Sequence, residues 1–297
     1  MKIYISSISV DIVRKYRKFF PDSRINVLRS FAVLDNDVAL LCKRFRPQIG
    51  GLILDSGTWT LNQAPSALAA NITVDKYIAY LCTAAKYFDF YFNFDSNFEP
   101  NGFNQNYADQ LKIESSGFCP VPVVHDIVGR EIQTYINRNY PRVALGSRQI
   151  KTLATLQKVM LQFAGTGIKV HLFGQTSFDL LANAPIHSCD TAMWAREGGW
   201  GKIRYWNPLK EGENKTDRIY LEEYVSADPA EGITFSKYPY RKEFEAYLWD
   251  TFGLTYGDLI GKDRSINKQL VNTHYFVQLE RIITEIHKKK GFDTEES

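Results

Sequence analysis

Strand-length apolar runs alternate with helix-length amphipathic segments over the first two thirds of the chain, and this alternation is the feature that most restricts its fold. The runs are rich in Val, Ile, Leu, Phe and Tyr and almost continuously apolar, as expected for strands buried on both faces. They are Lys2–Ser6, Ile25–Val33, Leu52–Asp55, Phe88–Asp95, Val121–His125, Val143–Gly146, Val170–Gly174 and His187–Asp190. Strands and helices in this alternation form βαβ units with a parallel sheet.

Helices are expected between these runs, and the first of them begins with Thr73, a residue type that caps helices. The expected helices are Thr73–Lys86, Asn104–Glu114, Arg130–Asn139, Gln149–Phe163 and Thr176–Asn183. Eight strands are the number that closes a (β/α)8 barrel, so we predict an α/β fold of this TIM-like type. An open doubly wound sheet is the alternative, but no G-x-G-x-x-G pattern follows the first strand.

The sequence changes character after Asn207, where a polar, turn-rich stretch extends to Asp217. Helical periodicity returns at Glu243–Thr251 and Ile266–Lys290. We therefore predict a barrel catalytic domain over residues 1–207 and a helical extension over residues 208–297 that packs on it.

The composition of the 297 residues, 44% hydrophobic and 23% charged, is that of a folded chain and not a disordered one. No apolar run approaches the roughly 20 residues that span a bilayer, and the first residues do not resemble a signal peptide. We therefore predict a cytoplasmic protein with no membrane partner. The cysteines are too dispersed for a zinc site of clustered thiolates. They are Cys42, Cys82, Cys119 and Cys189.

Polar residues or glycines end six of the predicted strands. They are Asp55, Asp95, His125, Gly146, Gly174 and Asp190. The carboxyl ends of barrel strands converge on one mouth, where catalytic groups lie. A single Asp at such a place commonly serves as a turn residue or a helix cap. Three carboxylates and a histidine at matching positions instead indicate an enzyme with carboxylate chemistry.

Two carboxylates that face one pocket suit glycosyl transfer or hydrolysis, because one attacks the anomeric carbon while the other handles the proton. A divalent metal is the alternative for a mouth of Asp and His residues. However, no H-x-H pattern occurs near the first strand, and among the three histidines of the strands only His125 ends one. We therefore predict neither a metal site nor a cofactor.

Six short motifs occur in order along residues 25–207. They are Leu54–Thr60, Phe92–Asp95, Pro122–His125, Ala144–Gly146, Val170–Ser177 and Asp190–Trp194. Together they resemble the tRNA-guanine transglycosylase superfamily, and most closely its branch of phage and bacterial DNA deazaguanine transglycosylases. Two departures are visible. Thr58 replaces the second glycine of the D-S-G-G pattern, and no cysteine follows Cys189, so the zinc site that the tRNA enzymes carry near the C-terminus is lacking.

The resemblance implies a role for each of nine residues. Asp190 would attack C1′ of a guanosine nucleotide and hold the sugar covalently, while Asp55 would protonate the leaving base and later deprotonate the incoming one. Asp95 would accept hydrogen bonds from the N1–H and exocyclic amine of the base. The other residues expected at the base pocket are Ser56, Gly57, His125, Gly146, Ser147 and Gly174.

The implied activity is that of a pentosyltransferase that replaces guanine in DNA with a 7-deazaguanine such as preQ0, in the cytoplasm of a bacterial cell. Basic residues at Arg14–Lys18, Lys43–Arg46 and Lys288–Lys290 favour a phosphate-binding surface, which we expect beside the mouth of the barrel. Solvated helix faces are the alternative explanation for these runs.

Three other functions stay open. Base exchange could take place on tRNA, or the chain could be a glycosyl hydrolase or transferase that acts on free nucleosides or nucleotides. A catalytically silent binding protein on the same barrel is disfavoured, because Asp55, Asp95 and Asp190 are all present.

Overall fold

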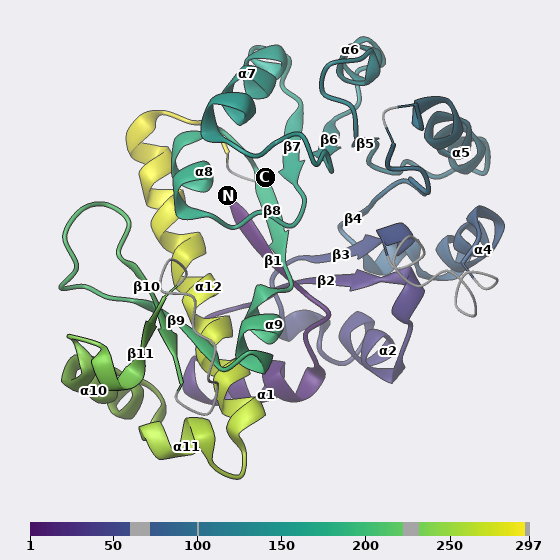
Figure 1. Cartoon of the computed structure of the whole chain (residues 1–297). Coiled ribbons are helices and arrows are strands. Elements are labelled where there is room, and N and C mark those ends of the chain that lie inside the picture. Colours follow the sequence, from purple (N-terminus) through teal and green to yellow (C-terminus); the bar gives the residue numbers. More distant parts are fainter. Residues whose placement is uncertain (60–71, 100, 222–231, 295–297) are drawn as a thin grey trace.

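A computed structural model describes residues 1–59, 72–99, 101–221 and 232–294 (Figure 1). Eight parallel strands form one curled sheet in the order β4-β3-β2-β1-β8-β7-β6-β5. The strands are β1 Lys2–Ser6, β2 Asn26–Ser30, β3 Leu52–Asp55, β4 Phe90–Tyr91, β5 Val123–Val124, β6 Arg142–Leu145, β7 Lys169–Leu172 and β8 Ser188–Thr191. Each overlaps one of the eight apolar runs, so the predicted α/β fold with a parallel sheet is confirmed.

The strand order is that of a (β/α)8 barrel opened between β4 and β5. β1 pairs with β8 in the middle of the sheet, where Tyr4 lies opposite Asp190. At the two edges, an isolated parallel bridge joins Phe92 to Val121, and the Asn93 amide donates to the Val121 carbonyl at 2.9 Å. The sheet is therefore a curled half-barrel, consistent with a TIM-like barrel, in which no strand ladder closes the circle.

Helices follow the strands in turn along the chain (Figure 1). They are α1 Val10–Phe19, α2 Asn36–Cys42, α4 Val74–Ala84, α5 Phe103–Ser115, α6 Glu131–Asn137, α7 Leu153–Phe163 and α8 Phe178–Asn183. Several begin at a capping side chain: Ser9, Thr73 and Thr152 each accept a hydrogen bond from a backbone amide of the first turn. Such caps satisfy amides that have no partner within the helix.

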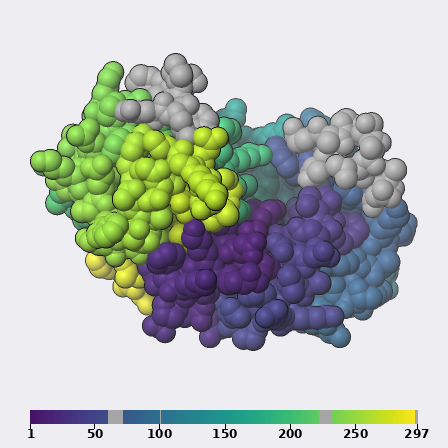
Figure 2. Space-filling view, turned by 90° about the horizontal axis from the view of Figure 1, so that it is seen from below, coloured from purple at the N-terminus to yellow at the C-terminus, as the bar shows by residue number. Residues whose placement is uncertain are grey.

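The chain after β8 forms both a small sheet and helices. Its elements are α9 Met193–Gly199, β9 Lys202–Trp206, β10 Thr216–Tyr220, β11 Ile233–Thr234, α10 Arg241–Phe252, α11 Tyr256–Ile260 and α12 Arg264–Lys290. The helices predicted near residues 243–251 and 266–290 are confirmed, whereas the three-stranded sheet in the order β11-β10-β9 was not predicted. Figure 2 shows this C-terminal part, green to yellow, against the purple N-terminal region.

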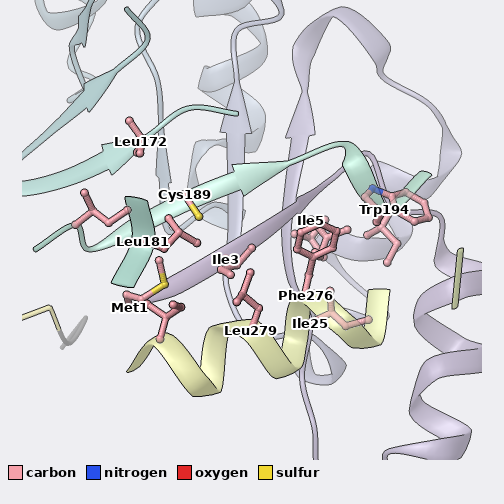
Figure 3. Close-up of a cluster of buried hydrophobic side chains, with 14 of the residues drawn as sticks. Met1, Ile3, Ile5, Ile25, Leu172, Leu181, Cys189, Trp194, Phe276 and Leu279 are labelled. Carbon is pink, nitrogen blue, oxygen red and sulfur yellow. The ribbon is translucent and has the colours of Figure 1, made fainter. Parts of the chain in front are cut away.

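The long helix α12 belongs to the layer of helices that covers the curled sheet, since it packs against β1, α1 and α8. Figure 3 shows Ile3 and Ile5 of β1 directed toward Phe276 and Leu279 of this helix, with Cys189 beside them. Burial of each such aliphatic or aromatic side chain contributes about 1.5–3 kcal/mol.

A second, smaller cluster of buried apolar residues comes from the opposite face of the strands. It consists of Tyr4, Leu28, Ile53, Phe92, Val121, Val123 and Ala144. Successive side chains of a strand point to opposite faces, which is why Tyr4 joins this inner cluster while its neighbours in β1 face α12. The inner cluster forms the floor below the carboxyl ends of the strands.

Candidate active site

The carboxyl ends of the strands surround a cavity of about 460 Å³. Seven of the nine predicted site residues line it: Asp55, Asp95, His125, Gly146, Ser147, Gly174 and Asp190. These residues follow or end six different strands, so the curled sheet brings together positions that are far apart in the chain. The two others, Ser56 and Gly57, lie behind this lining and contact its carboxylates. Thr60, the last residue of the first motif, lies outside the described residues.

Asp190 is held through both of its carboxylate oxygens. The hydroxyl of Ser6 donates to Oδ2 at 2.9 Å, and the amide of Gly174 donates to Oδ1 at 2.8 Å. The ring of His171 places Nε2 at 3.5 Å from Oδ1. Asp190 is only 8% exposed, and that small exposed part faces the cavity. A carboxylate so restrained has one orientation from which to attack an electrophilic carbon.

Cys189 precedes Asp190 but has a different environment. It is fully buried on the face of β8 that packs against α12 (Figure 3). Burial, and then the charge of Asp190, raises the pKa of this thiol well above its usual range. A thiol that stays protonated is a poor nucleophile.

Asp55 ends β3 and has a strongly perturbed acidity. Burial raises the pKa of Asp55 to about 7, and the charges of Asp95 and Asp190 act in the same direction. The Gly57 amide opposes this shift by donating to Oδ2 of Asp55 at 3.1 Å. A carboxyl with this pKa is divided between its two forms near neutral pH, which suits a group that both gives and takes a proton.

Asp95 anchors a buried network of side chains on one side of the cavity. Its Oδ2 contacts Nε2 of His125 at 2.8 Å, and its Oδ1 accepts from the hydroxyls of Thr58 at 2.9 Å and Ser56 at 3.3 Å. The Thr58 departure from the D-S-G-G pattern therefore adds a hydrogen bond to the carboxylate. His125 is fixed in turn, because its backbone amide donates to Glu131 at 2.7 Å.

Two glycines of the motifs have steric reasons to be glycine. Gly57 has φ +82°, and a Cβ there would lie 2.3 Å from the Cβ of Ala32. A larger residue would therefore move the amide that contacts Asp55. A Cβ on Gly146 would lie 3.1 Å from the ring of His125, so this glycine permits close packing of the cavity wall.

An aromatic wall, formed by Trp59, Phe98 and His125, borders the cavity. The rings of His125 and Phe98 stack with centroids 4.8 Å apart, and those of Phe98 and Trp59 stack at 5.9 Å. The guanidinium of Arg148 lies 5.4 Å from the centroid of the Trp59 ring. Phe98 and Arg148 were not predicted as site residues, since neither ends a strand. Trp59 is 48% exposed, so its ring is available to stack on a flat ligand.

The end of β1 also belongs to the site, although no sequence motif predicted it. Ser6 contacts Asp190, as described above, and Ser7 lines the cavity with φ +57°, in the left-handed region. That conformation costs an L-residue about 1–2 kcal/mol, and such strain is concentrated at functional sites. The polar Ser6-Ser7 pair after an apolar strand was the available signal, but serine at a strand end is too common to single out.

The basic surface that we expected beside the mouth is not formed by residues 288–290. Thr284 contacts Met1 at the start of β1, and Lys290 donates to the carbonyl of Ala182 at the end of α8. Lys288–Lys290 therefore lie where the strands begin, at the opposite end of β1 from Ser6. That prediction is wrong because α12 runs antiparallel to β1. The arginines that do line the cavity are Arg148 and Arg196.

Trp194, Trp200 and Trp206, which follow β8, differ in their environments. Trp194 is buried and donates from Nε1 to the carbonyl of Ser6, and Trp206 packs against Phe178. Trp200 is exposed, but within the described part of the chain the cavity lining does not include it.

In residues 1–59, 72–99, 101–221 and 232–294, no three His, Cys, Asp or Glu side chains are grouped closely enough to hold a metal ion. Over those same residues, no helix combines the length and the apolar character needed to cross a membrane.

Comparisons with protein-family models, with curated proteins and with solved structures find no match for the chain.

Proposed function

We propose that the chain is a pentosyltransferase that exchanges the base of a guanine nucleotide through a covalent Asp190–sugar intermediate. One observation carries the proposal: the same cavity holds two carboxyls in contrasting environments. Asp190 is held by hydrogen bonds from Ser6 and Gly174, whereas Asp55 has a pKa of about 7. Carboxyl pairs separated in this way divide the roles of nucleophile and acid in glycosyl transfer.

In the first half of the reaction, an Asp190 oxygen forms a bond to C1′ while the bond from C1′ to the guanine nitrogen breaks. Protonated Asp55 transfers its proton to the departing base, so that guanine leaves neutral and Asp55 becomes a carboxylate. The transition state has oxocarbenium-ion character, and the nearby carboxylate of Asp190 stabilises its positive charge.

In the second half, the incoming 7-deazaguanine gives its ring N–H proton to the Asp55 carboxylate. Its nitrogen then bonds to C1′, and the ester bond between C1′ and Asp190 breaks. Both carboxyls return to their starting forms, so no oxidant, reductant or further reactant is consumed.

Asp95 is the group that we assign to the base edge. A carboxylate has about four acceptor sites, and three of them already receive hydrogen bonds from His125, Thr58 and Ser56. One further donor of a guanine-type base can bind without rearrangement. A second requires that the longest of the three bonds, from Ser56 at 3.3 Å, give way.

Arg148 and Arg196 support a substrate that carries phosphate. Both guanidinium groups belong to exposed residues that line the cavity, whose interior holds three carboxyls. Cations at the entrance of an acidic pocket suit a ligand with a neutral base and anionic phosphates. We propose DNA as the polymer because the motifs resemble the DNA branch of the superfamily. For the same reason, we propose that the curled sheet is a (β/α)8 barrel that closes across Phe92 and Val121.

The test is incorporation of radiolabelled guanine into four acceptors: duplex DNA, single-stranded DNA, tRNA and deoxyguanosine monophosphate. The wild-type chain is compared with Asp190→Asn and with Asp250→Asn, which changes an exposed carboxylate on α10. We expect label in DNA with the wild type and the Asp250 variant only. Label in tRNA or in the free nucleotide alone would refute the choice of DNA, and label in no acceptor would refute base exchange.

A further inference from the structure

His171, in β7, is a titratable residue that the proposed reaction does not use. It is 0% exposed, and its ring lies among aromatic side chains of the cavity floor. Its ring centroid is 4.9 Å from those of both Phe92 and Phe173, and 6.2 Å from that of Tyr4. A packed apolar core gains nothing from a histidine at such a place, and burial of a polar ring costs free energy unless its nitrogens have partners.

Both ring nitrogens of His171 face β8. Nδ1 lies 2.9 Å from the hydroxyl oxygen of Ser188, and Nε2 lies 3.5 Å from Oδ1 of Asp190. Ser188 and Asp190 are two residues apart on one strand, so their side chains share a face of the sheet. His171 therefore bridges two consecutive inward-facing residues of the strand that carries the nucleophile.

The partners of His171 decide which nitrogen holds the proton. The ring is enclosed by aromatic side chains, so the neutral form with one N–H is favoured over the cation. A hydroxyl can donate or accept, whereas a carboxylate only accepts. If the proton were on Nδ1, the lone pair of Nε2 would face the negative charge of Asp190. With the proton on Nε2, Ser188 donates to Nδ1 and the N–H points at Oδ1.

We propose that His171, fixed as its Nε2–H tautomer by Ser188, is a positioning residue that orients the Asp190 carboxylate for attack. This role rests on the proposed function, although the tautomer itself does not. Oδ1 then faces two donors, the Gly174 amide and His171, while Oδ2 faces the Ser6 hydroxyl. Oδ2 keeps the greater share of free lone pairs, and it is the oxygen that bonds to C1′.

The separation of 3.5 Å is long for a hydrogen bond. Contacts of catalytic groups are often loose in the free enzyme and shorten in the substrate complex. His171 is therefore expected to make its full contribution when the sugar reaches Asp190, which places its effect on turnover more than on binding.

The direct test is nitrogen NMR of the chain labelled with ¹⁵N-histidine, which reads the tautomer of His171 without any activity assay. His171→Gln identifies the signal. We expect a neutral ring with the proton on Nε2 from pH 5 to 8. The Nε2–H signal should shift in Asp190→Asn, because the charged acceptor that it faces is replaced by an amide. A proton on Nδ1, a charged ring, or an unchanged signal in Asp190→Asn would overturn the proposal.

The second test compares base exchange in Ser188→Ala with Ser177→Ala, a change of an exposed serine outside the cavity lining. Without the Ser188 hydroxyl, the proton of His171 is no longer fixed on Nε2. The kcat should therefore fall about 10-fold while KM stays unchanged. His171→Phe should lower kcat by about 10- to 100-fold, and His171→Gln, which can still donate, should recover part of it. Equal kcat values for the Phe and Gln variants would show a packing role only. If neither the wild type nor any variant exchanges bases, the proposed function fails. The NMR experiment then still decides whether His171 donates to Asp190.

Discussion

Two carboxyls with the same perturbed acidity occupy different regions of this protein. Burial raises the pKa of Asp55, at the mouth, and that of Glu280, in α12, to about 7 in each case. Glu280 Oε2 accepts hydrogen bonds from the Ile3 amide at 2.6 Å and from the side chain of Asn26 at 2.7 Å. It thereby ties the last helix to β1 and β2. Asp55 instead faces a cavity and two further carboxylates.

The difference shows that a raised carboxyl pKa does not by itself identify a catalytic group. Structural ion-pair and hydrogen-bond networks perturb acidity as strongly as active sites do. The cost of burying Glu280 is offset by the hydrogen bonds with which it stabilises the contact between α12 and the sheet. Within the described residues, the Asp55 carboxyl accepts hydrogen bonds from the backbone amides of Gly57 and Ser56, its close neighbours in the chain, so its burial beside like charges does not tie one element to another. A cost of this kind is typical of functional sites, in line with the role that we propose for Asp55.

The largest expected effect is a loss of activity without a loss of stability, caused by a change in the cavity. Asp190→Asn removes the proposed nucleophile but keeps the shape of the side chain, so base exchange should fall by about 10⁴-fold or more. The covalent adduct between protein and nucleotide, measured by mass spectrometry of the denatured reaction, should disappear. The thermal unfolding midpoint should stay close to that of the wild type. Undiminished exchange in this variant would contradict the role of Asp190.

Asp55→Asn should lower exchange by about 10²- to 10⁴-fold, because the amide can neither give nor take the proton. In the wild type, the protonated fraction of Asp55 falls as pH rises through about 7, so the single-turnover rate of base release should decline above that pH. The variant should lose this dependence. A rate in the wild type that stays constant from pH 6 to 9 would remove Asp55 from the role of acid.

Glu280→Ala should affect stability and leave exchange by the folded protein unchanged. The substitution leaves the amide of Ile3 and the side chain of Asn26 without their acceptor, at a cost of about 2–3 kcal/mol in the free energy of unfolding. Urea titration measures it. Glu285→Ala, which removes an exposed carboxylate of the same helix, is the control and should cost less than 0.5 kcal/mol, roughly the range for surface changes. Similar losses in the two variants would show that Glu280 does not anchor α12.

The pH dependence of stability sharpens the same comparison. The folded chain holds the Glu280 proton up to about pH 7, whereas the unfolded chain releases it near the ordinary glutamate pKa of 4.5. The folded state therefore binds more protons between these values, and its stability falls as pH rises from about 4.5 to 7. Glu280→Gln keeps an acceptor oxygen without the charge and should reduce this slope, leaving the share that Asp55 contributes through its similarly raised pKa. An unchanged slope would contradict the perturbed acidity of Glu280.

The sequence predicted the strand ends well because hydrophobic runs and the residues that follow them are local features. Asp55, Asp95, His125 and Asp190 all reach the cavity as a result. The contact between Ser6 and Asp190 spans 184 positions and depends on the pairing of β1 with β8, which no local pattern encodes.

The basic C-terminal run was misplaced for a related reason. Composition identifies a charged helix, but its position relative to the mouth depends on the path of the chain through residues 208–263. That path includes β10, whose first residues belong to the polar, turn-rich stretch, and the two-residue strand β11. The direction of α12 along the sheet then follows from the contacts of Glu280 and Thr284 with the start of β1, not from any property of the lysines.

The smallest expected effect tests which region contacts the polymer. Arg148→Ala and Arg196→Ala should each lower the slope of log affinity against log salt by about 0.9 for duplex DNA, since each removes one phosphate contact at the mouth. The double change Lys288→Ala/Lys289→Ala removes two cations from the opposite end of β1 and should leave the slope unchanged. Lys290 is kept in that control, because it donates to Ala182 and Asn183 and supports the end of α8. Fluorescence anisotropy of labelled DNA over a range of salt concentrations measures all four proteins. A slope that responds to the lysines and not to the arginines would place the polymer away from Asp190, and the mouth would then have to act on a free nucleotide.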